Sequence, residues 1–204
     1  NSEPAKGEAQ GKRPVENVMW FDCIAFCNEL TKKAGLGDSE CVYYSDAALS
    51  TVYTMSDANS YTVPQVKWGA KGFRLPTEAE WEWAAKGGTE YKWAGTDELD
   101  KLKDYAWYND NSNSKTHEVK QKQRNGYGLY DMSGNVWEWC WDQYGTLPNP
   151  MPPDYAGPAT SGSGRVGRGG SWNFIAENCV VGRRGNDDPD DSDGNLGFRV
   201  ACRP

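Results

Sequence analysis

The chain has 204 residues, enough for one domain with a single core. Its formal net charge is −7 and it has no Lys/Arg cluster, so it lacks the basic surface that nucleic-acid binding requires. The sequence contains neither a run long enough to span a membrane nor a recognisable signal peptide. Ten Trp and eleven Tyr can bury a large area, while 23 Gly and 11 Pro predict many turns. We therefore expect an irregular α+β domain held together by aromatic packing.

Residues 1–13 are polar and rich in small side chains. This composition predicts a flexible leader or tether. A single domain is expected over residues 14–204.

The first predicted helix lies within VMWFDCIAFCNELTKKAGLG, residues 18–37. Lys32 and Lys33 fall near its carboxyl end, where the helix dipole favours cations, and Gly35 can end it in a left-handed conformation. Its apolar residues recur at helical spacing and form one stripe. These residues are Trp20, Cys23, Ile24, Cys27 and Leu30.

The second predicted helix lies within FRLPTEAEWEWAAKGG, residues 73–88. Thr77 and Glu80 have the spacing of a capping box, and Gly87-Gly88 ends the segment. Trp81 and Trp83 are expected on or beside the packing side, as core residues.

Beyond Gly88 the turn residues leave room only for short strands. GNVWEWCWD alternates large and polar residues, which predicts a half-buried strand. The only histidine, His117, lies in a polar loop and is expected at the surface. Nothing near it marks a nucleophile, and the amino end of a helix explains Glu78 and Glu80, so hydrolytic catalysis lacks support.

The six cysteines fit no zinc pattern. One or two disulfides in an oxidising compartment and buried free thiols remain alternative interpretations.

Five motifs occur in one order: PVENVMWFDCIAFCNEL, GFRLPTEAEWEWAAKGG, NGYGLYDMSGNVWEW, GRGGSW and NLGFRVA. In that order they resemble the sulfatase-modifying factor family, whose formylglycine-generating-enzyme fold is a branch of the C-type lectin fold. The resemblance runs from about Pro14 to Ala201. It implies two helices flanking small twisted antiparallel sheets, with long loops that carry the binding face.

The catalytic branch of this family has two cysteines, five positions apart, shortly after its GGS motif. They hold copper and oxidise a substrate cysteine, which needs two accessible thiolates. In this chain Trp172 to Ala176 follow the motif and Cys179 stands alone. We therefore expect no catalytic residues, although a formylglycine-generating-type oxidase remains the alternative to exclude.

The tail, about residues 165–204, resembles the variable proteins of diversity-generating retroelements, in particular those of Treponema. In such proteins a template repeat is copied with random substitution at its adenines. Asparagine codons are therefore replaced by codons for many amino acids, while the surrounding framework residues are kept. Matching framework residues are Gly169, Gly170, Ser171, Trp172, Ala176, Asn178, Cys179, Arg184, Pro189, Asp190, Gly197, Phe198 and Arg199. The positions that match template asparagines, here called the variable set, are Asn173, Phe174, Ile175, Arg183, Gly185, Asn186, Asp187, Asp188, Asp191, Asp193, Gly194 and Asn195.

Every residue of the variable set can be encoded by a codon that ends in C with its first two bases free. Lys, Glu, Gln, Met and Trp cannot, and none occurs there. A scaffold that accepts many side chains must carry its core contacts elsewhere, so the set is expected on exposed loops. Phe174 and Ile175 would be anchors for a partner if exposed; the alternative is that both pack inward on Trp172.

The run DDPDDSDGN does not fit a calcium loop, because an EF-hand register places Val200 at the required glutamate. The resemblance implies a calcium ion at GLYDMSGNVWEW instead. Its ligands would be the carboxylates of Asp131 and Glu138 with main-chain oxygens near Ser133, Gly134 and Val136, which suit a hard cation. Alternatively Asp131 caps a turn and Glu138 pairs with a buried Arg. No cofactor is required, so calcium would be structural.

The resemblance also implies, approximately, a disulfide between Cys27 and Cys202. Free buried thiols are the equal alternative.

Together these observations predict a non-catalytic binding protein on a bacterial surface, anchored through a lipid-modified N-terminus outside this sequence. Its variable set would bind protein or glycan ligands, and the domain is expected to be a monomer. An invariant adhesion or accessory domain on the same scaffold is the second alternative.

Overall fold

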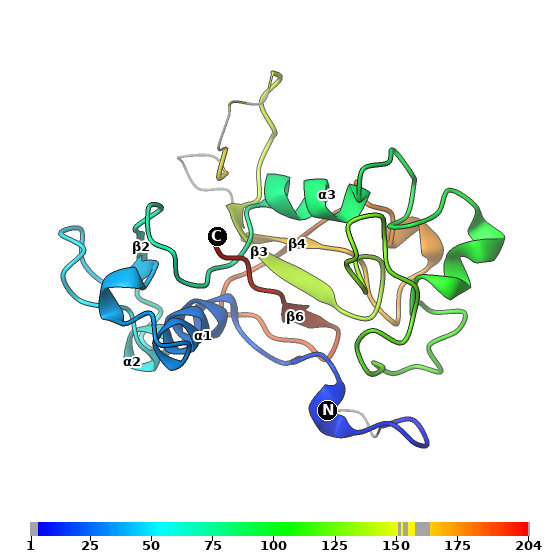
Figure 1. Cartoon of the computed structure of the whole chain (residues 1–204), viewed down its shortest axis with the longest axis horizontal. Helices are drawn as coiled ribbons and strands as arrows, with labels where there is room; N and C mark the ends of the chain where they lie inside the picture. Colours follow the sequence, from blue (N-terminus) through cyan, green and yellow to red (C-terminus); the bar gives the residue numbers. More distant parts are fainter. Residues whose placement is uncertain (1–3, 151, 153–154, 158–163, 204) are drawn as a thin grey trace.

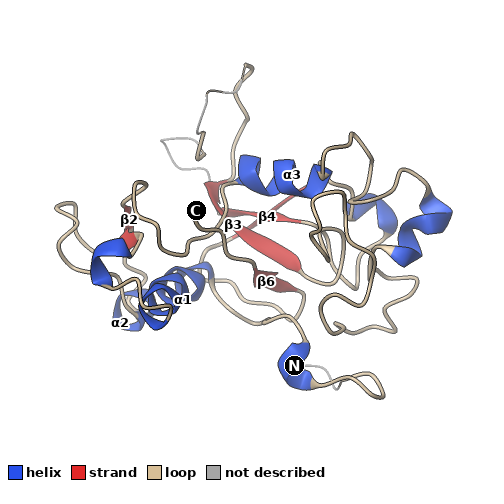
Figure 2. Cartoon of the chain, in the orientation of Figure 1, coloured by secondary structure: helices blue, strands red, loops and turns tan. Residues whose placement is uncertain are grey.

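A computed structural model describes residues 4–150, 152, 155–157 and 164–203 (Figures 1 and 2). Its helices are α1 (Trp20–Lys33), α2 (Met55–Asn59) and α3 (Glu78–Lys86), with short 3-10 turns at Gln10–Lys12, Asp38–Glu40, Leu99–Asp104 and Ala176–Asn178. Its strands are β1 (Tyr43–Tyr44), β2 (Gln65–Val66), β3 (Trp137–Gln143), β4 (Arg165–Arg168), β5 (Arg184–Asp187) and β6 (Leu196–Phe198). The expected α+β fold is confirmed. No helix in these ranges is long and apolar enough to cross a membrane.

The central sheet has the strand order β5-β4-β3-β6, and β1 and β2 form a separate antiparallel pair. β4 is antiparallel to both β3 and β5, but β6 is parallel to β3, with Trp137 opposite Leu196. The expectation of purely antiparallel sheets is therefore wrong at this edge. β5 and β6 run in the same direction at opposite edges, so residues 188–195 must lead from the end of β5 back across the sheet to the start of β6.

β3 separates two layers of the core. Trp139 faces α1, where it packs in one cluster with Trp20 and Ile24, whereas Cys140 faces α3 and packs with Trp81. Figure 1 shows these two helices on either side of the sheet. Because both faces of β3 are covered, the strand is almost entirely buried and not half-buried as predicted.

Both predicted helices are confirmed, with their ends where the sequence places them. In α3 the Thr77 hydroxyl accepts a hydrogen bond from the Glu80 N–H (3.2 Å), and the Glu80 carboxylate accepts one from the Thr77 N–H (2.9 Å). Gly87 then ends α3 at φ 61°. The prediction for Trp83 is wrong: Trp81 is buried, but Trp83 is 65% exposed. Two residues along a helix turn a side chain by about 200°, so the two indoles face opposite ways.

His117 lies in the interior, contrary to the surface position predicted from its polar loop. Its ring stacks on Trp107 with centroids 3.8 Å apart, and its Nδ1 lies 2.7 Å from a carboxylate oxygen of Glu8. The Ala9 N–H also donates to Glu118, so this part of the expected flexible leader is held against the domain. Glu8 and Ala9 lie more than a hundred residues from His117 and Glu118 in the chain, where no local pattern could reveal these contacts.

The first turn of α3 depends on a buried carboxylate from β3. Asp142 is 1% exposed, and its Oδ2 accepts a hydrogen bond from the Glu78 N–H at 2.6 Å. Burial, reinforced by the nearby Glu78 carboxylate, raises the pKa of Asp142 to about 7.

A raised pKa stabilises the fold below the ordinary value of the group, and this contribution is lost as pH rises through about 7. Asp142→Asn should therefore match the parent near pH 4 and exceed its free energy of unfolding near pH 8, by on the order of 3 kcal/mol. Urea denaturation at both pH values measures the difference. Equal stability of the two proteins near pH 8 would contradict the expectation.

Candidate ligand-binding face

The variable set falls on three segments: residues 173–175 after β4, residues 183–188 around β5, and residues 191–195 before β6. None of its twelve residues is buried. Phe174, Gly185, Gly194 and Asn195 are half-buried. The exposed members are Asn173, Ile175, Arg183, Asn186, Asp187, Asp188, Asp191 and Asp193. All three segments of the tail are thus available to solvent, although their binding role stays a prediction.

A pocket joins the three segments. Its floor includes Trp137 and Leu196, which are paired across β3 and β6. Seven residues of the variable set line it: Phe174, Arg183, Gly185, Asn186, Asp187, Asp193 and Asn195. A Cβ added at Gly185 would lie 3.4 Å from the Trp137 ring, so a larger side chain there would project over this floor.

The sequence did not single out Trp137 as part of a site. Its motif and its alternation predict a strand, but not which face of that strand meets the tail. Phe174 packs edge-on against Trp137, with centroids 5.6 Å apart and ring planes at 86°. Of the two predicted anchors, Phe174 is therefore half-buried on Trp137 and not on Trp172, while Ile175 is 53% exposed.

Main-chain contacts hold the variable segments in place. The Phe174 carbonyl accepts a hydrogen bond from the Asn109 N–H (2.9 Å), and the Asn195 carbonyl accepts one from the Trp137 N–H (2.7 Å). The Asp193 carbonyl accepts from Asn17 N–H (2.9 Å), and β5 is paired along its length with β4. Because a carbonyl is the same for every residue type, these anchors survive a change of side chain.

Side chains of the variable set bond little to the framework. Asn173 accepts hydrogen bonds from Ser171 (2.7 Å) and from Asn195 (3.1 Å). Within the described ranges, no salt bridge involves any of the twelve. Burial and the neighbouring Asp191 and Asp193 carboxylates raise the pKa of Asp187, so this rim carries uncompensated negative charge.

The framework residues explain why the tail holds its shape. Gly170 has φ 72°, and a Cβ there would lie 2.6 Å from Cys179 Sγ, so a side chain would collide with the core. Trp172 and Phe198 are half-buried. The Trp172 indole N–H donates a hydrogen bond to the Gly194 carbonyl at 3.1 Å, which ties Trp172 to residues 188–195 between β5 and β6.

A buried ion network fastens β5 to α3. The Arg184 guanidinium contacts both carboxylate oxygens of Glu78, at 2.5 and 2.7 Å. Arg168, whose side chain is fully buried, approaches the same carboxylate at 3.3 Å and also pairs with Glu82. The framework residue Arg184 is therefore the point where the variable tail is bound to the scaffold.

All six cysteines are free thiols in this structure. Cys27 is buried in the core and Cys202 is exposed, so the disulfide implied for this pair is not formed. Cys179 is buried, and burial raises the pKa of its thiol to about 12. A thiol with so high a pKa is not a nucleophile near neutral pH.

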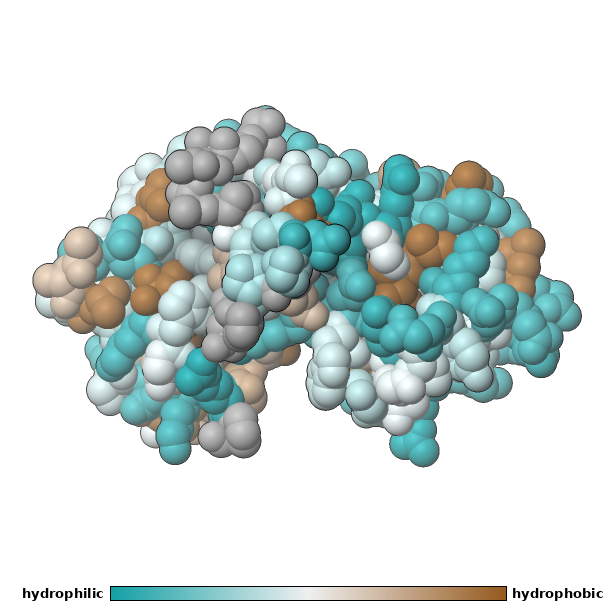
Figure 3. All heavy atoms as spheres, turned by 90° about the horizontal axis from the view of Figure 1, so that it is seen from above, coloured by the Kyte–Doolittle hydropathy of each residue, from teal (hydrophilic) through white to brown (hydrophobic). Residues whose placement is uncertain are grey.

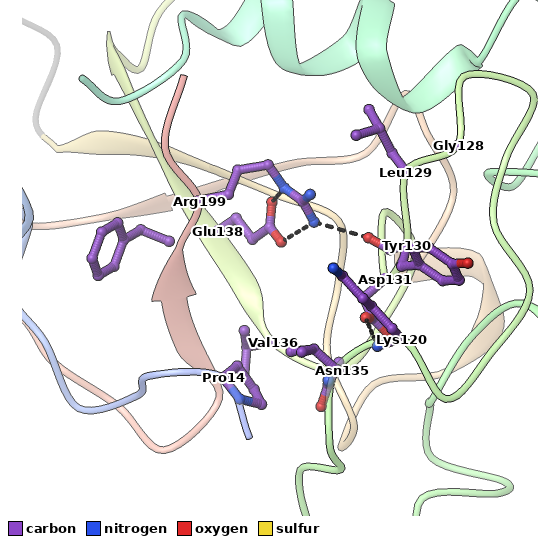
Figure 4. A pocket seen from close by; sticks show the side chains of 12 residues that line it. Pro14, Lys120, Gly128, Leu129, Tyr130, Asp131, Asn135, Val136, Glu138 and Arg199 are labelled. Atoms are coloured by element: carbon purple, nitrogen blue, oxygen red, sulfur yellow. Dashed lines mark hydrogen bonds and ion pairs between the residues drawn. The ribbon is translucent and has the colours of Figure 1, made fainter. Parts of the chain in front are cut away.

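Asp131, Val136 and Glu138 of the expected calcium ligands line a second pocket together with Arg199, shown in Figure 4, whereas Ser133 and Gly134 are not part of its lining. Glu138 accepts two hydrogen bonds from Arg199, at 2.5 and 2.6 Å, as in the alternative reading of this carboxylate. No group of three or more His, Cys, Asp or Glu side chains able to hold a metal occurs among the described residues.

Asp131 nevertheless retains an unsatisfied acceptor. Its Oδ2 accepts a hydrogen bond from the Lys120 N–H (2.9 Å), but its buried Oδ1 has no partner. Burial raises the pKa of this carboxyl group. A cation would satisfy the orphaned oxygen, Glu138 would join as a ligand on exchanging Arg199 for the ion, and main-chain oxygens would complete the calcium site.

Comparison with known proteins agrees with this architecture. The profile of the sulfatase-modifying factor enzyme 1-like domain matches residues 2–204. The chain belongs to this family. Among curated relatives, the chaperone protein LppX of Paenibacillus barcinonensis is 31% identical, over 98% of this chain and 72% of that protein. The formylglycine-generating enzyme of Streptomyces coelicolor is 39% identical, over 72% of this chain and 50% of the enzyme.

Among solved structures, Treponema denticola variable protein 1 is 50% identical and superposes with a TM-score of 0.88, covering 100% of this chain and 76% of that one. CarF is 26% identical, with a TM-score of 0.70 over 96% of this chain and 69% of its own. The fold expected from the motifs is therefore confirmed, as is the similarity to a variable protein of Treponema. The family matches alone establish the scaffold and not an activity.

Proposed function

We propose that this family member is a non-catalytic binding module whose variable set is diversified by a retroelement and meets protein or glycan ligands. One observation carries the proposal: the main chain anchors three variable segments around a pocket, while their side chains remain unburied. The similarity to Treponema denticola variable protein 1 supports it. Display on a bacterial surface, through a lipid-modified N-terminus, belongs to the same proposal.

An oxidase of the formylglycine-generating class is the competing function. It would need two thiolates near the GGS motif, whereas Cys179 is buried with a strongly raised pKa and Phe174 lies five positions before it. An invariant adhesion domain would have the same scaffold, but no reason to leave its side chains unbound to the framework.

A library experiment tests the binding face directly. The twelve positions are randomised on this scaffold, displayed, and selected against one purified protein such as lysozyme. We expect folded, target-specific binders. A matched library of twelve exposed positions around α1 and α2 should give none, because that surface lacks the anchored pocket. Binders appearing equally from both libraries would contradict the proposal.

Diversification is tested separately in the genome. A nearby template repeat should differ from the region encoding residues 165–204 only where the template has adenine, and a reverse-transcriptase gene should lie beside it. Absence of both would favour the invariant domain.

Calcium is a second proposal for this domain. Asp131 and Glu138 would bind it with main-chain oxygens of Gly134 and Val136, and the ion would fix the loop before β3. Millimolar calcium should raise the melting temperature by several degrees over EDTA, because a ligand of the native state stabilises it. Asp131→Asn should abolish this increase, whereas magnesium should not reproduce it. An identical melting temperature in calcium and EDTA would contradict the proposal.

A further inference from the structure

A separate pocket opens along α3, the helix drawn toward the top of Figure 1, the side from which Figure 3 views the molecule. None of the variable set lines it. Its lining consists of Glu78, Ala79, Glu82, Trp83, Lys86, Asp142, Leu147 and Tyr155. Three carboxylates and two aromatic side chains, Trp83 and Tyr155, thus surround one cavity.

Of these carboxylates, only Asp142 is without a cation. Glu78 is held by Arg184 and Arg168, and Glu82 by Arg168. Lys86 lies 3.8 Å from Glu82 and 3.0 Å from Glu90. Within the described ranges no salt bridge reaches Asp142. One oxygen of Asp142, Oδ1, is buried and has no hydrogen-bond partner.

Such an oxygen is expensive to leave unsatisfied. A buried acceptor without a donor has lost its hydration without a replacement, and the loss is larger when the group is charged. The nearest cations on other elements are Arg165 of β4 and Arg184 of β5, but Arg165 donates to the Trp141 carbonyl (2.7 Å) and Arg184 is bound to Glu78. The acceptor therefore has no cation of its own, and because Asp142 lines the pocket, a donor that enters it reaches Oδ1 once the carboxylate turns toward the cavity.

The aromatic wall indicates what kind of donor fits. Trp83 is 65% exposed and is kept in position by Tyr127, whose ring centroid is 4.6 Å away. An indole face attracts a cation through its quadrupole and also packs against an aliphatic chain. An ammonium group offers three N–H donors and no acceptor, so it complements the Asp142 carboxylate and the rings of this lining, whose one ammonium, Lys86, is already paired with Glu82 and Glu90.

We propose that this pocket binds a primary ammonium group on an apolar stem, with the ammonium on Asp142 Oδ1 and the stem along Trp83. A lysine side chain and a small alkylamine both carry this chemistry. The interaction requires the ionised form of Asp142. Since burial places the pKa of Asp142 at about 7, with Glu78 and Glu80 of α3 also disfavouring its charge, binding should strengthen between about pH 6 and about pH 8.

The test is an NMR titration of the ¹⁵N-labelled protein with n-pentylamine and with Nα-acetyl-lysine methylamide. The uncharged control, which keeps an apolar stem but has no ammonium group, is Nα-acetyl-norleucine methylamide. We expect saturable shifts of the Trp83 indole N–H and of the first turn of α3 with both amines, with Kd on the order of 1 mM, and none with the norleucine amide. If the lysine derivative binds tenfold more tightly than n-pentylamine, the ligand is a peptide lysine. If n-pentylamine binds tenfold more tightly, the ligand is a free amine.

Variants locate the binding groups. Asp142→Asn should weaken amine binding at least tenfold and remove its pH dependence. Trp83→Ala, at an exposed position where folding is preserved, should weaken it several-fold. Glu90→Gln removes a charge that is 86% exposed and outside the lining, so its affinity should stay within twofold of the parent. Equal binding of the norleucine amide, or unchanged affinity in Asp142→Asn, would overturn the proposal.

Discussion

Replacing Glu78 by Ala should lower the free energy of unfolding by about 3–5 kcal/mol, the cost of removing one partner from a buried ion pair. The Glu78 side chain is 5% exposed, and its removal leaves Arg168 with no exposed surface and only Glu82 as a counter-ion. It also frees Arg184 of β5. Urea denaturation measures the loss, and hydrogen exchange should show the amides of β5 exchanging faster than those of α1.

The matched control is Glu98→Ala. The Glu98 side chain is 59% exposed and pairs only with Lys101, so its loss should cost less than about 1 kcal/mol. Equal stability of Glu78→Ala and Glu98→Ala would show that the ion pairs of Glu78 with Arg168 and Arg184 do not stabilise the attachment of the tail to the scaffold.

Trp139→Ala should cost about 3–5 kcal/mol, because a fully buried indole is replaced by a cavity. Its indole N–H also donates to the Val18 carbonyl at 3.1 Å, which would lose its partner. Replacing Trp172 or Phe198, which are half-buried, should cost less than Trp139.

Substitutions in the variable set should cost much less stability than Trp139→Ala. Asn173, Ile175, Asn186 and Asp188 changed together to Ala should cost no more than about 2 kcal/mol, since each exposed substitution lies within about 0.5 kcal/mol. Thermal and urea unfolding of both proteins measures the difference. A cooperative loss of folding in the fourfold variant would show that these side chains, and not the aromatic core, stabilise the tail.

Local features of the fold followed from the sequence because their interactions lie within a few residues. The capping box at Thr77 and Glu80 spans one turn, and the helical stripe from Trp20 to Cys27 repeats with the helix period. The order of the motifs then indicated the family. The composition of the variable set, polar or small with few exceptions, predicted its exposure.

Features that depend on distant partners did not follow. His117 is buried because Glu8 and Trp107 meet there, and Trp83 is exposed because α3 already packs through Trp81. The sequence also could not predict that Trp137 of β3 faces the tail, since alternation along a strand does not say which element covers which side.

By itself, then, the sequence determined the helices and the family and predicted the variable set, all of which are properties of short segments or of their order. Only the tertiary structure decided that these positions surround one pocket over Trp137, and that Asp142 lies with one oxygen unsatisfied beside Trp83. The physical reason is the crossing of residues 188–195 between parallel edge strands, together with the burial of β3 on both faces. Both arise from contacts between segments that are distant in the chain.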